Sequence, residues 1–428
     1  MKKTHATSIG AAIGPSVGMP AIAASIAILF AVRIPTYAAI IPISPVGGES
    51  VQLVPDVQKT IMGIATREER IEIIRQDREH GDGKIYNNPM WRKAVPLKLS
   101  WRATEGETGP WKIEIGTEPG LENAEVRYVH EKSEELVTED RGDDGAVTVW
   151  MMPRANLEVA RPYWWRVTGR CVRNQQWHLV PSETASFATE DRAPRWIEVE
   201  GKVRNIRDFG GWHTTDGHRV RQGMAFRGQG LNDNSLTGEQ QGRNRLTVED
   251  VKYFTRTLGI KTDLDLRTKM ETADLEESPL GPGVKFILRE SQAYRKIFNE
   301  DGKKAMAANI RLFCDPGNYP IYFHCIGGAD RTGSLAYVLL GVLGVSRHDI
   351  ETDWESTFYP NIPDGRYAED YWCRGSHLTD GISKYGADGD TWQRRCELYL
   401  LDCGITQDEI ARLREILLVE SGRMKGQS

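Results

Sequence analysis

One cysteine stands where its neighbours could make it reactive. In residues 322–340, YFHCIGGADRTGSLAYVLL, Cys325 follows an apolar run and precedes a glycine-rich turn, and Arg331 comes after five intervening residues. The run at 320–323 predicts a short central strand, and the apolar stretch from about Thr332 predicts a helix. Cys325 should therefore lie between a strand end and a helix start, the edge at which open α/β sheets bind ligands.

This position favours an anion on the sulfur of Cys325. The unpaired amides and the dipole of a helix amino terminus stabilise a thiolate, and a nearby cation adds to the effect, so we expect a nucleophile. The turn amides can form a nest for a tetrahedral oxyanion, and Arg331 offers a planar two-point grip on its oxygens. Gly327 and Gly328 permit backbone angles that a side chain would forbid. The pattern predicts a phosphate cradle formed by the turn residues Ile326, Gly327, Gly328 and Ala329.

Two further residues flank this cradle. We expect His324 to order the loop and help hold the thiolate, although a hydrogen-bonded core histidine fits the pattern equally well. The hydroxyl of Thr332 could donate a hydrogen bond to the sulfur. A plain strand-turn-helix with a buried cysteine is the alternative for the whole stretch, and the combination of residues favours the chemical interpretation.

Three ordered blocks carry a resemblance to a known family. The stretch HCIGGADRTG resembles the signature loop of cysteine-based protein tyrosine phosphatases. Residues 203–231, beginning VRNIRDFGG, resemble the Asn-Phe-Arg-Asp-Leu-Gly-Gly region of bacterial tyrosine/dual-specificity phosphatases, with Ile206 and Phe209 as departures. Residues 246–268 are similar to the family's helix-strand segment that ends in Asp-Leu-Arg. The resemblance covers residues 200 to about 345 and, more loosely, the tail to 428.

The resemblance implies a phosphocysteine mechanism. The Cys325 thiolate would attack phosphorus while the turn amides and Arg331 stabilise the transition state, and water would then cleave the intermediate. The leaving oxygen needs a proton, and Asp330 is the first candidate because relatives carry aspartate before the loop arginine. Asp301 and Asp315, on the segment before the loop strand, stay open as rivals.

The roles of other residues in the matching blocks stay open. Asp263 and Asp265, in TDLDLR, favour a structural role. Four residues are candidates for buttressing the loop or touching the substrate, with a purely structural role equally open: Asn205, Arg207, Asp208 and Arg227.

Ala329 bears on the choice of substrate. Several relatives have a lysine at this position, and its charge suits phosphoinositide head groups. Phosphotyrosine and other monoesters are therefore favoured, unless a group of arginines faces the cleft and compensates: Arg204, Arg207, Arg219 and Arg221.

Alternative functions remain open. A module that binds a phosphorylated ligand without turnover, a dual-specificity or phosphoinositide phosphatase, and sulfur or arsenate chemistry all use similar loops. The sequence has no Gly-x-x-x-x-Gly-Lys, His-Glu-x-x-His or paired Cys-x-x-Cys pattern, so we expect no cofactor and no metal. The net charge of −5 argues against nucleic acid, and a phosphorylated protein or small phosphomonoester is the expected partner.

The first residues predict export. Lys2 and Lys3 precede a stretch without charge up to Arg33, and Ala38 and Ala39 supply a small-residue cleavage site. Residues 1–39 thus have the layout of a signal peptide, which predicts a periplasmic or extracellular protein. An uncleaved membrane anchor is the alternative, because the uncharged stretch is long enough to span a bilayer.

The length of 428 residues allows two domains, and changes in the sequence pattern divide the chain into segments. Residues 40–88 predict a helical connector, with Thr66 and Glu69 forming a capping box. Residues 89–193 alternate with period two between turns, and they resemble a fibronectin type III or immunoglobulin-like sandwich. Residues 196–428 mix strands and helices, and the resemblance implies a tyrosine-phosphatase-like α/β domain with a central, largely parallel sheet.

The tryptophans of the sandwich segment allow two interpretations. Trp101, Trp164 and Trp165 could form a sugar-binding platform, but tryptophans in strand patterns more often fill a core. We expect a spacer or docking module, with a protein or a glycan as its partner.

The six cysteines are too sparse for a disulfide scaffold. One bridge could form within Cys373, Cys396 and Cys403, and buried free thiols are the alternative. Cys314 could protect Cys325 by a reversible bridge; peroxide-treated protein in which mass spectrometry finds Cys325 only as sulfinic or sulfonic acid would contradict this.

Overall fold

The computed structural model describes residues 40–80, 94–104, 106–140, 146–231, 245–272, 275–357 and 368–420. These residues all belong to one compact unit, Ala38–Ser428. The expected signal peptide at 1–39 and the side chain of Cys373 lie outside the described residues.

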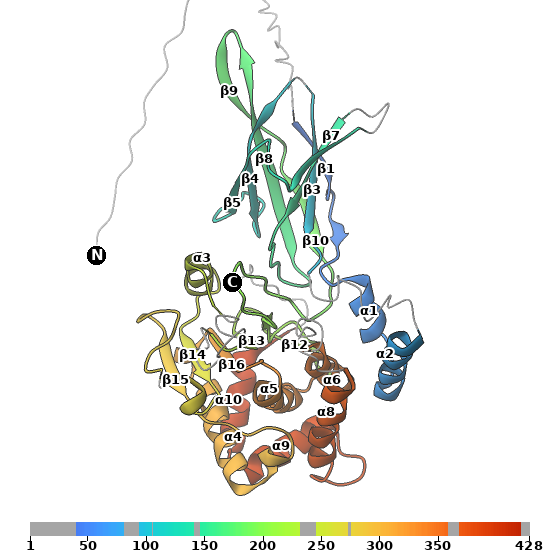
Figure 1. The fold of residues 1–428 in the computed structure, drawn as a ribbon, viewed down its shortest axis with the longest axis vertical. Coiled ribbons are helices and arrows are strands. Elements are labelled where there is room, and N and C mark those ends of the chain that lie inside the picture. Colours follow the sequence, from blue (N-terminus) through green and yellow to red (C-terminus); the bar gives the residue numbers. More distant parts are fainter. Residues whose placement is uncertain are drawn as a thin grey trace, which may run out of the picture. The chain divides into compact units, whose positions relative to one another are not determined.

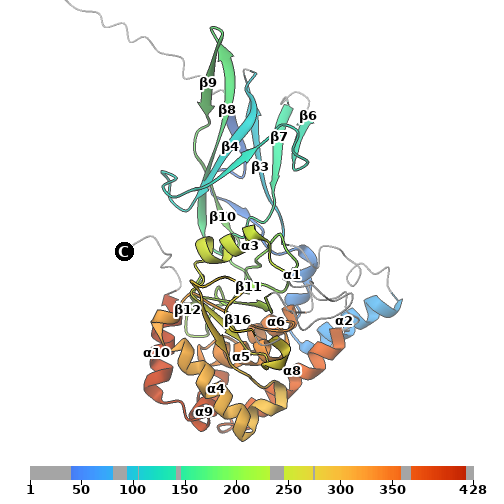
Figure 2. The same ribbon diagram turned by 60° about the vertical axis from the view of Figure 1, so that its left-hand side comes forward.

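Two sheets form an all-β part, and Figures 1 and 2 show their long strands running alongside one another. The first sheet has the antiparallel order β1 (Ile40–Ser44), β3 (Leu97–Ala103), β7 (Ala146–Met152), β6 (Leu136–Asp140). The second has the order β2 (Glu49–Val51), β10 (Ala185–Thr189), β8 (Pro162–Arg173), β4 (Thr108–Gly116), β5 (Glu125–Val129), and β9 (Gln176–Pro181) pairs with β8.

Two of the three tryptophans predicted to fill a core, Trp101 and Trp165, belong to the core of the sandwich, whereas Trp164 is half-buried. Trp101 and Trp165 are fully buried, and the ring of Trp101 meets that of Trp111 edge to face at 5.2 Å. Neither ring is therefore available as a sugar-binding platform. Trp177 on β9, by contrast, is 63% exposed, and its ring lies 4.7 Å from the guanidinium of Arg170.

The segment expected as a connector has a mixed structure. Its first strands, β1 and β2, pair with β3 and β10 of the sandwich. Helices α1 (Asp56–Met62) and α2 (Arg67–His80) follow, and Thr66 caps α2 by accepting the amide of Glu69 at 3.3 Å. The buried side chains of Ile61 and Met62 join the core of the α/β part instead of the sandwich core.

The second part is built on a five-stranded sheet. Its order is β11 (Arg207–Asp208), β13 (Ala225–Gln229), β16 (Ile321–Cys325), β14 (Thr262–Asp265), β15 (Lys285–Leu288). Four strands run parallel and β11 is antiparallel, which confirms the expected largely parallel sheet. Every residue of β16 is buried, as the apolar run predicted.

One helix is central to this part. Helix α5 (Asp330–Val342) is buried over nearly its whole length, and Figure 1 shows it among the other helices. The remaining helices and short elements are α3 (Val248–Lys252), α4 (Glu300–Phe313), α6 (Arg347–Ser356), α8 (Ala368–Ile382), α9 (Trp392–Asp402), α10 (Gln407–Leu417), η4 (Tyr253–Thr257), η5 (Met270–Thr272), η6 (Tyr294–Phe298), η7 (Pro316–Asn318), β12 (His218–Val220) and β17 (Leu418–Glu420).

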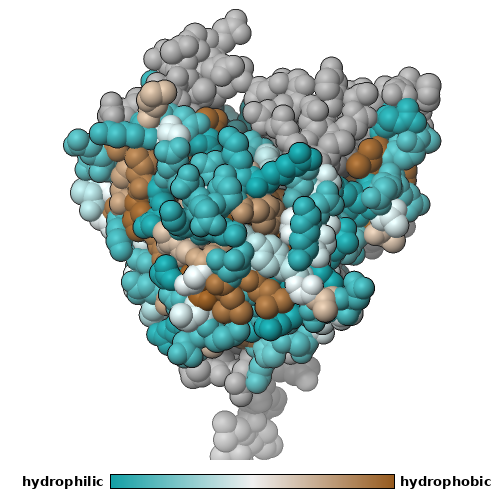
Figure 3. Space-filling model, turned by 90° about the horizontal axis from the view of Figure 1, so that it is seen from below, coloured by the Kyte–Doolittle hydropathy of each residue, from teal (hydrophilic) through white to brown (hydrophobic). Residues whose placement is uncertain are grey.

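The surface of the α/β part is mainly hydrophilic where Figure 3 shows it, with a few separate hydrophobic clusters. Among the described residues, no helix has the length and apolar character needed to cross a membrane.

The cysteines with described side chains are all free thiols. Cys396 and Cys403 therefore do not bridge each other. Cys314 donates to the carbonyl of Glu409 at 3.3 Å, and its protective bridge to Cys325 stays a prediction.

A buried ion pair fastens α2 to α6. Arg70, 1% exposed, directs Nε to Glu355 at 2.7 Å and Nη2 to the same carboxylate at 3.3 Å. Arg67 approaches Glu355 at 3.3 Å, and its guanidinium lies 6.0 Å from the ring of Trp354. Burial raises the pKa of Glu355 from 4.5 to about 7, although the charge of Arg70 opposes this.

This pair predicts a pH-dependent stability. Because the folded-state pKa exceeds the unfolded one, the stability contributed by protonated Glu355 is complete below about pH 4.5 and is lost as the pH rises through 7. Relative to Glu355→Gln, the wild-type free energy of unfolding should fall by on the order of 3 kcal/mol across this window. Denaturant unfolding at several pH values measures the difference. Glu300→Gln, which removes an exposed carboxylate, should follow wild type, and parallel profiles for Glu355→Gln would contradict the prediction.

Candidate active site

The structure places Cys325 where the spacing predicted it. Cys325 is the last residue of β16 and is 2% exposed. Helix α5 begins five residues later, at Asp330, and its first turn carries Arg331. Gln229 on β13 lies opposite Cys325, so the loop is located at the carboxyl edge of the parallel strands.

Two buried side chains determine how the loop peptides are oriented. Asn205 donates to the carbonyl of Gly327 at 3.0 Å, and Arg227 donates to that of Gly328 at 3.1 Å. In a planar trans peptide the N–H points opposite to the C=O, so the amides of Gly328 and Ala329 are directed away from these side chains. Among the described residues, these two amides donate to no protein group. They are thus available to an anion in the loop.

A shared carboxylate holds this supporting layer together. Asp353 on α6 accepts from Nε of Arg207 at 2.8 Å and from Nη1 of Arg227 at 2.5 Å. Arg207 also donates to Oδ1 of Asn205 at 2.5 Å. Burial alone would raise the pKa of Asp353, but the two guanidinium groups lower it below its usual value. Burial and the charge of Arg207 lower the pKa of Arg227 to about 10.

This layer bears on the alternatives left open for Asn205, Arg207, Asp208 and Arg227. Asn205, Arg207 and Arg227 are at most 2% exposed, and the bonds from Asn205 and Arg227 to the loop carbonyls favour the buttressing role, which stays a prediction. Asp208 is not part of the group. Its carboxylate accepts from Arg195 at 3.1 Å and from the amides of Gly210 and Gly223, both at 2.8 Å, and burial raises its pKa.

Glu271 is a site residue that the sequence did not indicate. Its carboxylate accepts hydrogen bonds from Nη1 and Nη2 of Arg331 at 2.6 and 2.8 Å. The hydrogen bond from Arg331 lowers the pKa of Glu271 to about 2. Burial alone would lower the pKa of Arg331, but the bond to Glu271 and the neighbouring Cys325 raise it. A guanidinium has five N–H donors, so this bidentate pair fixes its plane while donors remain for phosphate oxygens.

His324 matches the core-histidine alternative. It is 1% exposed, its Nε2 lies 2.8 Å from Oδ1 of Asp263, and its Nδ1 lies 3.8 Å from Oδ1 of Asp265. The structural role expected of both aspartates agrees with these contacts. Thr332 is fully buried, and within the described part of the chain its hydroxyl has no partner. Its bond to the sulfur of Cys325 stays a prediction.

The three candidate acids lie in different places. Asp330 is in the first turn of α5 beside Arg331, and the hydroxyl of Tyr294 donates to its Oδ1. Asp301 is exposed in the first turn of α4. Asp315 caps η7 before the amino end of β16, which is the sheet edge opposite Cys325. Of the three, Asp330 is the residue adjacent to Arg331, the predicted phosphate ligand.

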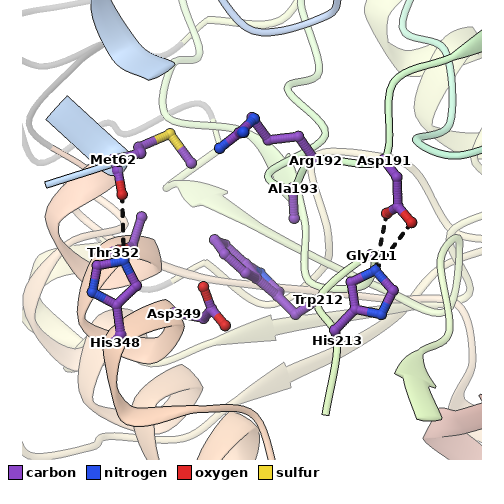
Figure 4. A pocket seen from close by; sticks show the side chains of 11 residues that line it. Met62, Asp191, Arg192, Ala193, Gly211, Trp212, His213, His348, Asp349 and Thr352 are labelled. Atoms are coloured by element: carbon purple, nitrogen blue, oxygen red, sulfur yellow. Dashed lines mark hydrogen bonds and ion pairs between the residues drawn. The ribbon is translucent and has the colours of Figure 1, made fainter. Parts of the chain in front are cut away.

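A cavity of about 320 Å³ lies elsewhere in the described residues. Figure 4 shows Trp212 in its middle, with His213 paired to Asp191 on one side and His348 next to Met62 on the other. None of the lining residues comes from the loop between β16 and α5, so this cavity is not the predicted cradle.

Comparisons with known proteins agree with this location. Residues 197–361 match the model of the Tyrosine phosphatase family. A Cupriavidus necator protein named as a candidate tyrosine-protein phosphatase is 25% identical over 197 residues, covering 39% of this chain and 67% of that protein. The matched residues include Asn205, Arg207, Arg227, Glu271, Asp353 and the loop from Cys325 to Arg331.

Two solved structures also match part of the chain. The core catalytic domain of the PP-IP phosphatase SIW14 from S. cerevisiae, in complex with citrate, is 19% identical and covers 37% of this chain and 84% of its own, with a TM-score of 0.24. A Siw14 catalytic core is 17% identical and covers 38% and 81%, again with a TM-score of 0.24. The family match and the C. necator relative support a cysteine-based phosphatase of the tyrosine-phosphatase type.

The two loop glycines predict a contrast. Gly328 has φ of +66° and a Cβ there would meet the carbonyl oxygen of Gly228 at 2.3 Å, whereas a Cβ on Gly327 would find nothing nearer than 3.9 Å. Of the two positions at which we expected only glycine to fit, Gly328 has this requirement and Gly327 does not. Gly328→Ala should lower the free energy of unfolding by about 2–4 kcal/mol, and Gly327→Ala by less than about 1 kcal/mol, measured by urea unfolding. Equal losses in the two variants would contradict this.

Proposed function

We propose that this chain hydrolyses phosphomonoesters through a phosphocysteine on Cys325. The observation that carries the proposal is the joint orientation of the loop: its carbonyls are held from below by Asn205 and Arg227, and Arg331 is held by Glu271. The amides of Gly328 and Ala329 and the guanidinium of Arg331 are thereby oriented before any substrate arrives. Such preorganised donors are the main source of transition-state stabilisation for transferring phosphoryl groups.

The reaction has two steps. The Cys325 thiolate attacks phosphorus, the bond from phosphorus to the leaving oxygen breaks, and Asp330 supplies that oxygen with a proton. Water then attacks the phosphocysteine, the sulfur–phosphorus bond breaks, and Asp330 takes up the proton of the water. Arg331 and the amides of Ile326 to Ala329 bind the equatorial oxygens in both steps. Thr332 donates to the sulfur, and His324 orders the loop from the core side.

Phosphotyrosine and other monoesters are the proposed substrates. Ala329 adds no charge to the cradle, and three of the four arginines that could compensate are engaged elsewhere. Arg207 is buried on Asp353, Arg219 pairs with Asp191 at 2.6 Å, and Arg221 donates to the carbonyl of Leu418 at 3.0 Å. This disfavours a head group with several phosphates. A dual-specificity or phosphoinositide phosphatase, and a module that binds without turnover, are the alternatives to be tested.

The test is hydrolysis of 4-nitrophenyl phosphate by the reduced full chain in the presence of a chelator. Cys325→Ser should lower kcat by about a thousandfold or more, because the attacking group is lost. Cys171→Ser, which alters a buried thiol of the sandwich, is the matched control and should keep wild-type activity. Activity that survives in Cys325→Ser would reject the mechanism. An inactive wild type that still binds inorganic phosphate would favour the binding module, and turnover of arsenate or thiosulfate would favour the other chemistries.

We further propose that the protein is exported and that residues 89–193 serve as a fibronectin type III-like spacer or docking module for a protein or glycan partner. The basic start, uncharged middle and small residues of the first 39 positions support export. Expression of the full chain followed by fractionation and amino-terminal sequencing should give a product that starts near residue 40 in the periplasm or medium. Full-length protein in the membrane fraction would favour the anchor, and full-length protein in the cytosol would reject export.

A further inference from the structure

Tyr294 has a backbone conformation that is uncommon for a bulky residue. It begins η6 with φ of +55°, in the left-handed region that few residues other than glycine adopt. Such a conformation is strained and persists where the surroundings hold it, often at functional sites. The contacts of Tyr294 show what holds it.

Three contacts fasten Tyr294 to the start of α5 and to α6. Its amide donates to Oγ of Ser334 at 3.0 Å, and the same Oγ donates to the carbonyl of Asp330 at 2.8 Å. The ring of Tyr294 meets that of Trp354 edge to face at 6.2 Å. The hydroxyl donates to Oδ1 of Asp330. The backbone and the side chain of Tyr294 thus both bind the turn that carries Asp330.

The hydroxyl makes a contact that the position of the ring does not require. The amide bond to Ser334 and the packing on Trp354 would fix the position of a phenylalanine equally well. A hydroxyl on a partly buried carboxylate has a different effect: it restricts rotation about the Cβ–Cγ bond of Asp330 and so sets the direction of the second oxygen, Oδ2. The proton transfer assigned to Asp330 depends on that direction, because a general acid must lie within hydrogen-bond reach of the leaving oxygen.

We infer that Tyr294 is a positioning residue for proton transfer: its hydroxyl holds Oδ1 of Asp330 so that Oδ2 delivers the proton to the leaving oxygen. The inference rests on the proposed phosphatase function. In the first step the proton passes from Asp330 to the leaving oxygen as the bond to phosphorus breaks. In the second step the same oxygen receives the proton of the attacking water as the sulfur–phosphorus bond breaks. Tyr294 itself exchanges no proton and touches no substrate.

The charged groups around Asp330 limit what else could do this work. Arg331 follows it on α5 and is occupied by Glu271 of η5, while Cys325 at the end of β16 is the nucleophile. These groups bind or attack the phosphoryl group. Tyr294 comes from η6, and its hydroxyl is a neutral donor to the carboxylate.

The test compares two substrates that differ in their need for an acid. The leaving group of 4-nitrophenyl phosphate is stable as an anion, whereas that of phenyl phosphate needs a proton. In the full chain, Tyr294→Phe should lower kcat/KM for phenyl phosphate about tenfold and that for 4-nitrophenyl phosphate less than about threefold. Asp330→Asn should show the same pattern with a larger loss. In the double variant the phenyl phosphate loss should not exceed that of Asp330→Asn, because Tyr294 acts through Asp330.

Controls separate this role from a structural one. Tyr385→Phe removes another tyrosine-carboxylate bond, 2.7 Å from Asp402, and should leave both substrates unaffected. Tyr294→His, which keeps a ring donor, should regain part of the phenyl phosphate rate. Equal losses for the two substrates, multiplying losses in the double variant, or a histidine variant as slow as Tyr294→Phe would overturn the inference. Failure of the phosphatase proposal would be seen separately, as activity that does not depend on Cys325.

Discussion

The site depends on two buried guanidinium groups that share one carboxylate. Arg207 and Arg227 are fully buried, and Asp353 between them is 2% exposed. Taking three charges out of water is costly, and such a group persists only when nearly every donor and acceptor is satisfied. Here some of the donors are directed at loop atoms: Arg227 donates to the carbonyl of Gly328, and Arg207 orients Asn205, which donates to that of Gly327. The buried charges thereby fix the direction of the loop amides.

Helix α6, which carries Asp353, also contacts Tyr294 and α2. Three consecutive residues of the helix, Asp353, Trp354 and Glu355, have different partners. Asp353 holds the arginines under the loop, Trp354 packs on the ring of Tyr294, and Glu355 receives Arg70 from α2. Successive residues of a helix point about 100° apart, so one turn can reach three neighbours. The loop, the candidate acid and the amino-terminal helices are all positioned by one turn of one helix.

The sequence predicted the parts of the site that lie close together along the chain. Cys325 and Arg331 are separated by the five residues of the turn, and the strand before them and the helix after them have clear apolar patterns. Local sequence rules were therefore sufficient to predict this part of the site. Glu271, Tyr294 and Asp353 were not found, because each reaches the loop from a distant segment and none lies in a local motif. A carboxylate such as Asp353 can be assigned only when the fold shows which buried cations surround it.

The same limit explains the mixed outcome in the block around Arg207. Arg207 and Asp208 are adjacent and form β11, so their side chains leave a strand on opposite faces. One face covers the loop and the other meets Arg195, which is why neighbours with similar chemistry have unrelated partners. Sequence likeness identified the segment, but the alternation of the strand decided the role of each residue.

The amino-terminal strands escaped prediction for a related reason. β1 and β2 are short and without clear alternation, and they are recognisable only by the strands they join. Between them and β3 the chain contributes Val54, Ile61 and Met62 to the core of the α/β part. Residues 40–80 therefore belong to both cores. A cut between α2 and β3 would remove two strands from the sandwich. It would also remove Arg70, which binds Glu355, and Glu355 lies two residues from Asp353 on α6. The sandwich is consequently interleaved with the α/β part along the chain. Helices α1 and α2 lie between β2 and β3 in sequence, and Arg70 of α2 binds Glu355 on the turn of α6 that also carries Asp353.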